Sequence, residues 1–388
     1  MQRWTTLGAS VILLSMAPLP CPATASAQPF VNDALDPTLV ESYKDAQFVL
    51  YGYFADKTSN DFVIEKVLKN HDVLKGKTVI ALTASWRPKN NCVVFCETVK
   101  GVLHSSRAED VLPTSPLLDY LPHALKLNDE PPAKRLRFYF DFLNSTDAVL
   151  ALDAHREFAR AKYADCRDLA KKLPAKQLVD WLKDPKTRPD RLGLYSVLLG
   201  HCGNPKADGA LLRSILDDPN KLVALNYVQP GRILAGYILL QPKEGWDELQ
   251  IWLKNDKEDG FNQRYAAYAT LRFFWESEAE GLSKKQILEG TGMLLRLPDV
   301  ADFAIDALRE WKQWDRTDEI LGLYKKQNFD NPIVSRAILR FALSSPAPRA
   351  AQFVTEQRKR DPEWVSDTEE LLRQMILEEK AAAEAKKT

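Results

Sequence analysis

The stretch RLGLYSVLLGHCGNPKADGALLRSIL, residues 191–216, decides the fold that we predict for most of this chain. Its first half is mostly apolar, and a Gly-Asn-Pro tripeptide ending at Pro205 forms a stop signal after it. Proline is tolerated as the first residue of a helix, and Leu212 and Ile215 then recur at helical spacing. The stretch therefore predicts two helices joined by a tight turn.

The same register returns along the C-terminal two-thirds of the chain. Leu or Ala lies three positions after each starting residue and Leu lies seven positions after it, the starting residues being Arg191, Arg232, Arg264, Ala301 and Arg336. Their intervals of 41, 32, 37 and 35 residues are typical of stacked helix pairs that bury apolar stripes against their neighbours. A weaker copy starts at Ala151. We therefore predict five to six helix pairs over residues 116–372 and a charged, solvated helical tail at 373–388.

Arginine occupies four of the five starting positions. Stacked arginines at one helix position can bond carbonyl or aspartate oxygens of a neighbouring repeat, and we expect that structural role. A ladder of arginines that binds anions is the alternative.

Residues 45–115 differ from the rest, because their apolar runs are short and rich in β-branched and aromatic side chains. Polar turns separate four runs that predict strands, namely AQFVLYGYFA (46–55), DFVIEKVL (61–68), KTVIALT (77–83) and CVVFCETV (92–99). Four or five such strands predict a small antiparallel β-sheet or partly closed barrel. The predicted fold class is therefore α+β, with a small N-terminal antiparallel β domain followed by an all-α solenoid.

Residues 1–27 are typical of an export signal. Arg3 precedes a short apolar run, and small residues predict cleavage between Ala27 and Gln28. Prolines interrupt the run before it reaches the roughly 20 residues that a membrane helix needs. We therefore expect a polar lead at 28–44, no membrane span in the mature chain, and a periplasmic or extracellular location.

Cysteine usage leaves two questions open. Cys21 lies in the leader and leaves a lipoprotein signal as an alternative. Cys166 and Cys202 are 36 residues apart, about one repeat, so stacking could bring them together as a candidate disulfide, with two buried thiols as the alternative. Cys92 and Cys96 would lie about 13 Å apart on one face of a strand, so we expect two buried, unbridged thiols there.

The composition and motifs argue against most catalytic chemistry. The 53 basic and 53 acidic side chains balance, so no global field favours nucleic acid as a partner. The sequence contains no zinc-helix histidine pair, nucleophile elbow, phosphate loop, dinucleotide fingerprint or haem motif. His201 and Cys202 could form a nucleophilic pair only if their side chains met, and the helix stop after them favours a structural role. We predict no catalytic residue, no metal ligand and no cofactor.

The recurring Arg-x-x-(Ala/Leu)-x-x-x-Leu pattern, clearest in residues 191–216 and in RYAAYATLRFF (264–274), resembles HEAT-like helical-repeat proteins. The chain is also similar to a group of exported bacterial proteins that join a small N-terminal β domain to such an array. The stretches that carry this likeness are FVIEKVLKNHDVLKGK (62–77), CVVFCETVKG (92–101), LYSVLLGHCG (194–203) and ILRFALSSP (338–346). The β segment resembles an oligonucleotide/oligosaccharide-binding barrel or its netrin-like variant. These resemblances imply a fold and a binding surface, and they carry over no catalytic residue.

A long regular array without convergent ionisable groups predicts a non-enzymatic scaffold that recognises a protein or polymer partner through its repeat surface. Aromatic and arginine side chains commonly anchor protein interfaces, so the candidate partner-binding residues are Arg272, Trp252 and Trp275. Packing of the two rings in the core is the alternative.

Two other functions remain open from the sequence. An enzyme or enzyme subunit could place a site at the junction of β domain and array, where His104, His123 and His155 could meet. The β module could also act as an inhibitor or a carbohydrate binder.

Overall fold

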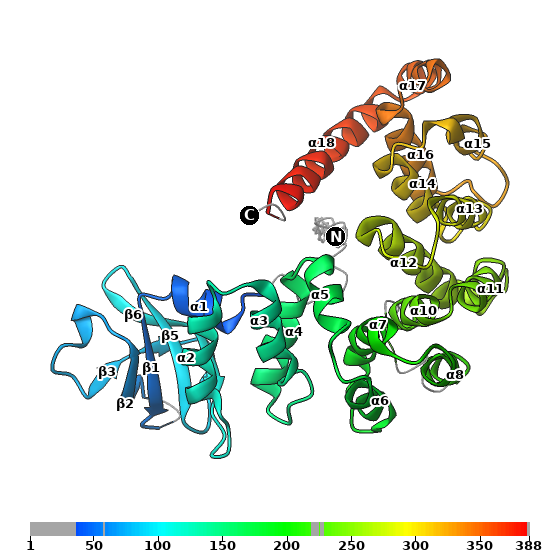
Figure 1. The fold of residues 1–388 in the computed structure, drawn as a ribbon. Coiled ribbons are helices and arrows are strands. Elements are labelled where there is room, and N and C mark those ends of the chain that lie inside the picture. Colours follow the sequence, from blue (N-terminus) through cyan, green and yellow to red (C-terminus); the bar gives the residue numbers. More distant parts are fainter. Residues whose placement is uncertain (1–35, 57–58, 219–224, 226–228, 386–388) are drawn as a thin grey trace, which may run out of the picture.

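A computed structural model describes residues 36–56, 59–218, 225 and 229–385. It has an N-terminal curled β-sheet followed by helices to the end of the described chain, so the α+β class is confirmed (Figure 1). The predicted export signal and the cleavage position between Ala27 and Gln28 lie outside the described residues.

The sheet has six strands in the order β3-β2-β1-β5-β6-β4. The strands are β1 (Phe48–Phe54), β2 (Asp61–Lys69), β3 (Val79–Ala81), β4 (Thr83–Ala84), β5 (Cys92–Val99) and β6 (Val102–Asp110). The prediction of a purely antiparallel sheet was wrong, because β4 pairs with β6 in parallel. Leu82 alone separates β3 from β4, although they lie at opposite ends of the strand order. The sheet must therefore curl until its two ends meet.

Strands β1 and β5 are apolar on both faces because both faces are buried. Val49 and Phe95 face the helices and belong to the main core of the molecule. Phe48, Leu50 and Val94 point the other way, into a second core inside the curled sheet. Strands with two buried faces are expected to have continuous apolar runs instead of alternation.

Two elements of the β domain were not predicted. Helix α1 (Leu39–Asp45) forms within the expected polar lead, where Thr38 and Glu41 make a capping box at its N-terminus. Strand β6 is polar along most of its length, and its backbone pairs with β5 and β4. The capping box is a local signal for α1, whereas β6 forms because tertiary pairing overrides a weak local signal.

The helical part begins at Leu117, close to the predicted boundary. Its helices are α2 (Leu117–Leu127), α3 (Pro132–Phe140), α4 (Ala148–Arg160), α5 (Tyr163–Ala170), α6 (Ala175–Lys183), α7 (Leu192–Cys202), α8 (Pro205–Leu216), α10 (Gln229–Leu240), α11 (Pro242–Leu253), α12 (Phe261–Ser277), α13 (Lys284–Leu294), α14 (Ala301–Glu310), α15 (Thr317–Leu321), α16 (Pro332–Ser344), α17 (Pro348–Arg360) and α18 (Pro362–Ala385). Proline is the first residue of α8, α11, α16 and α17, where its missing amide hydrogen costs least. The prolines therefore set these helix starts, as the sequence predicted.

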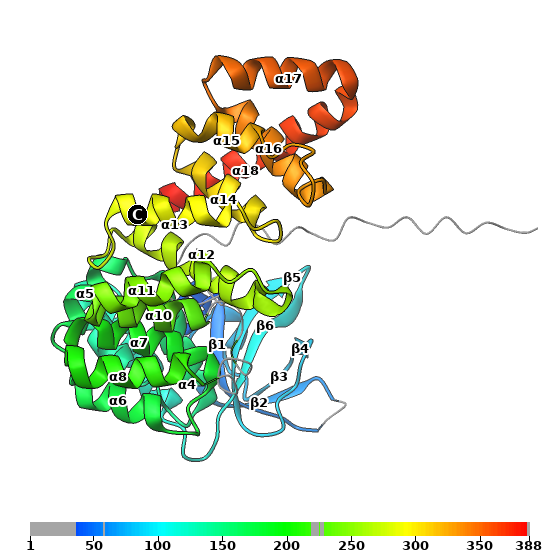
Figure 2. The ribbon, with the colours of Figure 1, turned by 90° about the vertical axis from the view of Figure 1, so that its right-hand side faces the viewer.

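The five aligned registers fall in α7, α10, α12, α14 and α16. Every residue at the third position is fully buried: Leu194, Ala235, Ala267, Ala304 and Leu339. At the seventh position Leu198, Leu271 and Leu308 are buried, and Leu239 and Leu343 are half-buried. Helices α8, α11, α13, α15 and α17 lie outside these five on the convex side of the curve, and Figure 2 shows the same layering from the side.

One contiguous core runs from α1 and the sheet to α18, reaching Val365. Helix α18 continues to Ala385, and Glu379 accepts a hydrogen bond from Arg309 of α14 at 2.8 Å. The expected solvated tail therefore packs, in part, against the helical body. Among the described residues, no helix has both the length and the apolar character needed to cross a lipid bilayer.

Candidate functional site

Trp252, a candidate partner-binding residue, lies in the core. Its side chain is 2 % exposed, and its indole N–H donates to Glu248 at 2.7 Å. Arg213 of α8 also bonds Glu248, so this carboxylate joins α8 to α11. Because it is buried, the ring of Trp252 offers almost no surface to a partner.

Arg272 and Trp275 are half-buried on the inner helix α12 and are engaged by neighbouring side chains. Arg272 donates to Glu276 at 2.6 Å, to the Tyr268 hydroxyl at 2.9 Å and to Glu310 of α14 at 2.8 Å. The Trp275 ring stacks on Trp311, with centroids 4.4 Å apart and planes at 20°. Both residues therefore hold α12 to its neighbours.

Arg272 belongs to a chain of ion pairs along the inner helices. Arg309 lies within salt-bridge distance of Asp306, Glu310 and Glu379, at 3.5, 3.6 and 2.8 Å. Arg340 of α16 also bonds Asp306, with Nε 3.0 Å from the carboxylate. Half-buried pairs are screened by salt less than exposed ones, so salt should weaken these ion pairs between the inner helices only modestly.

Three of the four arginines at the starting positions of the repeated register differ in burial and in their contacts. Arg264 is 4 % exposed and donates to Asp299 at 3.0 Å and to the Asn255 carbonyl at 2.7 Å. Arg191 is also buried and donates to the Leu143 carbonyl at 3.2 Å. Arg336, by contrast, is exposed. The expected structural role is confirmed for Arg264 and Arg191.

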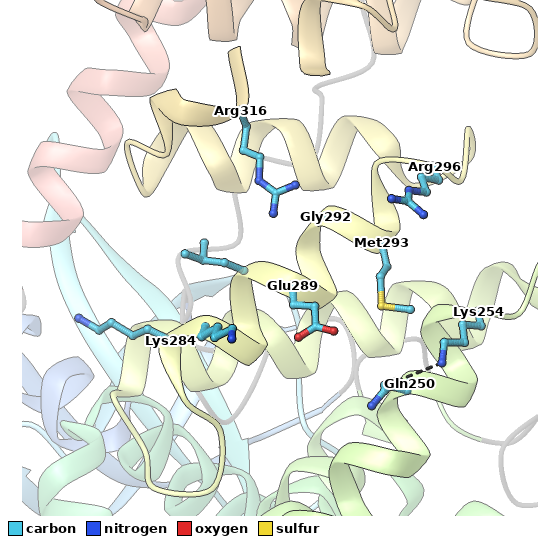
Figure 3. Close-up of a pocket in the computed structure, with 10 residues that line it drawn as sticks. Gln250, Lys254, Lys284, Glu289, Gly292, Met293, Arg296 and Arg316 are labelled. Carbon is cyan, nitrogen blue, oxygen red and sulfur yellow. Dashed lines mark hydrogen bonds between the residues drawn. The ribbon is translucent and has the colours of Figure 1, made fainter. Parts of the chain in front are cut away.

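A basic groove lies between the outer helices α11 and α13 and is bordered by the short 3-10 helix η5 (Trp314–Arg316). Its volume is about 840 Å³. The charged side chains that line it are Lys254, Lys284, Lys285, Glu289, Arg296 and Arg316. Figure 3 shows Arg316 and Lys254 approaching from opposite sides, with Glu289 between them.

Gly292 of α13 gives the Arg316 guanidinium its place above this helix. A Cβ atom at Gly292 would lie 2.9 Å from Arg316 Nη1, closer than real Cβ contacts. Arg316 forms an ion pair with Glu319 at 2.7 Å. Within the described chain, Lys254, Lys285 and Arg296 have no carboxylate partner, so the groove keeps a positive charge.

Sequence reasoning missed a buried carboxylate at the junction between the β domain and the helices. Asp153 of α4 is fully buried and accepts hydrogen bonds from the Leu39 backbone N–H at 2.6 Å and from the Tyr120 hydroxyl at 2.7 Å. Burial raises the pKa of Asp153, and these two hydrogen bonds oppose the shift. Asp153 therefore fixes the N-terminus of α1 on α4.

Glu157 lies one helical turn after Asp153 and is half-buried. Burial raises the pKa of Glu157 to about 7, and repulsion by the Asp153 carboxylate adds to the shift. Arg156 and Arg107 support the same junction by donating to the Pro37 carbonyl at 3.3 and 2.8 Å. Two carboxylates on the apolar face of α4 were the sequence signal for this network.

The three junction histidines contact different groups. His104 Nδ1 lies 3.1 Å from the Thr83 carbonyl, and the His123 ring stacks on Phe138 with centroids 4.7 Å apart. His155 is 4 % exposed, and burial lowers its pKa to about 3. Their contacts give no sign of a shared acid–base site.

His201 and Cys202 also have separate partners. His201 Nε2 lies 2.9 Å from the Tyr163 hydroxyl, and Cys202 Sγ donates to the Leu198 carbonyl at 3.5 Å. Burial, followed by the charge of Asp208, raises the pKa of Cys202 to about 11. These contacts favour a structural end of α7 over an activated thiol.

All four cysteines of the described chain are free thiols, so the candidate bridge between Cys166 and Cys202 is not formed in this structure. Cys166 is buried with its Sγ 4.0 Å from the Phe158 carbonyl. Cys92 and Cys96 are fully buried inside the curled sheet, as predicted. Within the described residues, no group of three or more His, Cys, Asp or Glu side chains could hold a metal ion.

Comparisons with protein-family models, with curated proteins and with solved structures found no match to this chain.

Proposed function

We propose that this protein is an exported, non-enzymatic scaffold in which a HEAT-like array of helix pairs recognises a protein partner. The observation that carries the proposal is a set of hydrogen bonds between residues that lie about one repeat apart in the sequence. These bonds join residues 33 to 38 positions apart: Tyr324 to Gln357, Arg340 to Asp306, Arg213 to Glu248, Arg264 to Asp299, Gly193 to Gln229 and Arg272 to Glu310.

These bonds support a repeat architecture, because the bonded residues are about as far apart in the sequence as consecutive starting positions of the repeated pattern. A unit of two helices has too little core to be stable alone, so each unit must bury its apolar residues against its neighbours. Burial of the five third-position residues supports the same arrangement. Such arrays offer long, rigid surfaces, and rigidity reduces the entropy lost on binding.

Several groups that could act in catalysis are engaged by their neighbours in the described chain, and this supports a binding role. In the described chain, the buried Asp153 has both carboxylate oxygens occupied by Leu39 and Tyr120. Neighbouring groups likewise engage the junction histidines and the Cys202 thiol. A general acid or base needs hydrogen-bond access to its substrate, which a fully buried and doubly bonded carboxylate does not offer.

Affinity capture from cell-envelope extract, with the mature chain tagged at its C-terminus, tests the proposal. We expect the tagged chain to capture one protein repeatedly. That protein, when tagged in turn, should capture this chain, and the two purified proteins should bind each other. N-terminal sequencing of the exported chain should begin at Gln28. Repeated capture without any such partner, or retention of the uncleaved chain in the cytoplasm, would count against the proposal.

A second candidate function belongs to the β module. If β3 and β4 are counted as one interrupted strand, five strands curl into the kind of barrel that binds oligosaccharides in other proteins. Trp86, between β4 and β5, is 53 % exposed, and Tyr53 of β1 is 39 % exposed. Exposed aromatic rings are suited to stacking on sugars. Quenching of tryptophan fluorescence by an oligosaccharide, lost in Trp86→Ala, would favour this function.

A further inference from the structure

Cationic side chains without carboxylate partners gather in the basic groove. Five of its six charged lining residues are Lys or Arg, and they come from α11, α13, the loop after α13, and η5. We propose that the basic groove binds an extended acidic segment of a protein partner, an inference that rests on the proposed function.

The charges of the groove are available to a ligand. Lys254 bonds only the neutral Gln250, at 3.0 Å, and Lys285 and Arg296 have no ion pair within the described chain. All three side chains belong to exposed residues. Carboxylates placed opposite them gain attraction with little desolvation, so binding should be salt-sensitive and should depend on charge complementarity.

The lining of the groove favours a peptide over a uniform polyanion. Glu289 lies among the cations and repels a chain that carries a negative charge at every unit, whereas a peptide can present a neutral group there. Leu288 and Met293, both half-buried, supply apolar contacts that a phosphate chain cannot use. The whole chain carries no net charge that would attract a polyanion from a distance.

The size and place of the groove fit the same occupant. A volume of about 840 Å³ lies within the roughly 300 to 1,000 Å³ of typical ligand sites. The groove lies between α11 and α13, two consecutive outer helices of the curve (Figure 1), and Figure 3 shows the side chains that line it. Because Lys254, Lys285 and Arg296 are exposed, an extended chain can reach them from solvent.

Fluorescence anisotropy with the mature chain tests the inference. The probe is a labelled peptide of about ten residues, ~33 Å when extended, in which Asp or Glu alternates with Leu. We expect binding that weakens with salt and falls by about tenfold in the double variant Lys285→Glu/Arg296→Glu. The matched control is Lys206→Glu/Lys359→Glu, which changes the net charge equally at exposed positions outside the groove and should bind as the parent does.

Three outcomes would overturn the inference. The first is that the peptide does not bind, and the second is that both double variants bind it equally. The third is tighter binding of inorganic polyphosphate than of peptide, with loss in the groove variant alone, which would assign the groove to a polyanion. A partner captured from envelope extract that binds parent and groove variant equally would reject the groove while leaving the scaffold proposal intact.

Discussion

A Cβ atom on Gly236 would lie 2.2 Å from the Ser196 carbonyl oxygen, so the backbones of α10 and α7 meet at this point. Gly236→Ala should force the two inner helices apart and lower the free energy of unfolding by about 1 to 3 kcal/mol, the usual cost of overpacking. Urea unfolding followed by circular dichroism measures this change.

Gly292→Ala is the matched control for that substitution. Its Cβ would meet the end of the flexible Arg316 side chain, which can move. Alanine in a helix interior is more favourable than glycine by about 0.5 to 1 kcal/mol, so this variant should be as stable as the parent or more stable. If Gly236→Ala proves as stable as Gly292→Ala, the approach of α7 and α10 is not tight.

The pair of Arg272 and Glu310 links α12 to α14, and we predict that it stabilises the fold. A double-mutant cycle with Arg272→Gln and Glu310→Gln should give a coupling energy of about 0.5 to 3 kcal/mol in urea unfolding. If the coupling is near zero while Arg272→Gln weakens capture of the partner, Arg272 belongs to the binding surface and our structural assignment is incorrect.

Glu157 should make the stability of the protein depend on pH. The pKa of Glu157 in the folded state is about 7, above its ordinary value of 4.5, so the folded state holds this proton more tightly than the unfolded chain. Its stabilising contribution is fully present below pH 4.5 and is lost as the pH rises through 7. Relative to parent, Glu157→Gln should therefore become more stable as the pH increases across this window.

The control for Glu157 is Glu363→Gln, at an exposed position on α18. Unfolding curves at several pH values should show a parallel shift, or none, for this variant. A constant difference between Glu157→Gln and the parent from pH 4 to pH 8 would contradict a carboxyl group whose pKa is raised by burial.

The thiols of Cys166 and Cys202 should react slowly in the folded protein. With a pKa of about 11, only about one Cys202 in a thousand is a thiolate at pH 8, and burial raises the pKa of Cys166 as well. Iodoacetamide should label both thiols rapidly in urea without reductant and slowly in the folded protein, and mass spectrometry measures the labelling. A requirement for reductant would reveal the disulfide, and fast labelling of native Cys202 would reveal an activated thiol.

The helices were predictable because their signals are local. Leucine spacing, the Gly-Asn-Pro stop and prolines at helix starts are contained within single segments such as 191–216. Strands β1 and β5 were predictable for a related reason, since two buried faces make them apolar throughout. Strand β6 was missed because pairing with β5 and β4 determines it, and helix α1 was missed although its capping box is a local signal.

The candidate site could not be predicted from the sequence, because it depends on contacts between segments that are far apart along the chain. Trp252 and Arg272 were good interface residues by type. In the structure Trp252 is buried and bonds Glu248, and Arg272 bonds Glu310 of α14. The basic groove escaped prediction because Lys254, Lys285 and Arg316 come from three segments that meet only after the helices stack.

In the array that we propose, nearest neighbours stabilise each helix pair. Leu308 is fully buried in α14, so Leu308→Ala should remove about 2 to 5 kcal/mol from the packing around it. Hydrogen exchange of the native mature chain, measured by mass spectrometry at low denaturant concentrations, reports this loss element by element. We predict faster exchange in α12, α14 and α16, with β1 and β5 as protected as in the parent. An equal loss of protection in the β-sheet and in α14 would mean one cooperative body and would contradict the array.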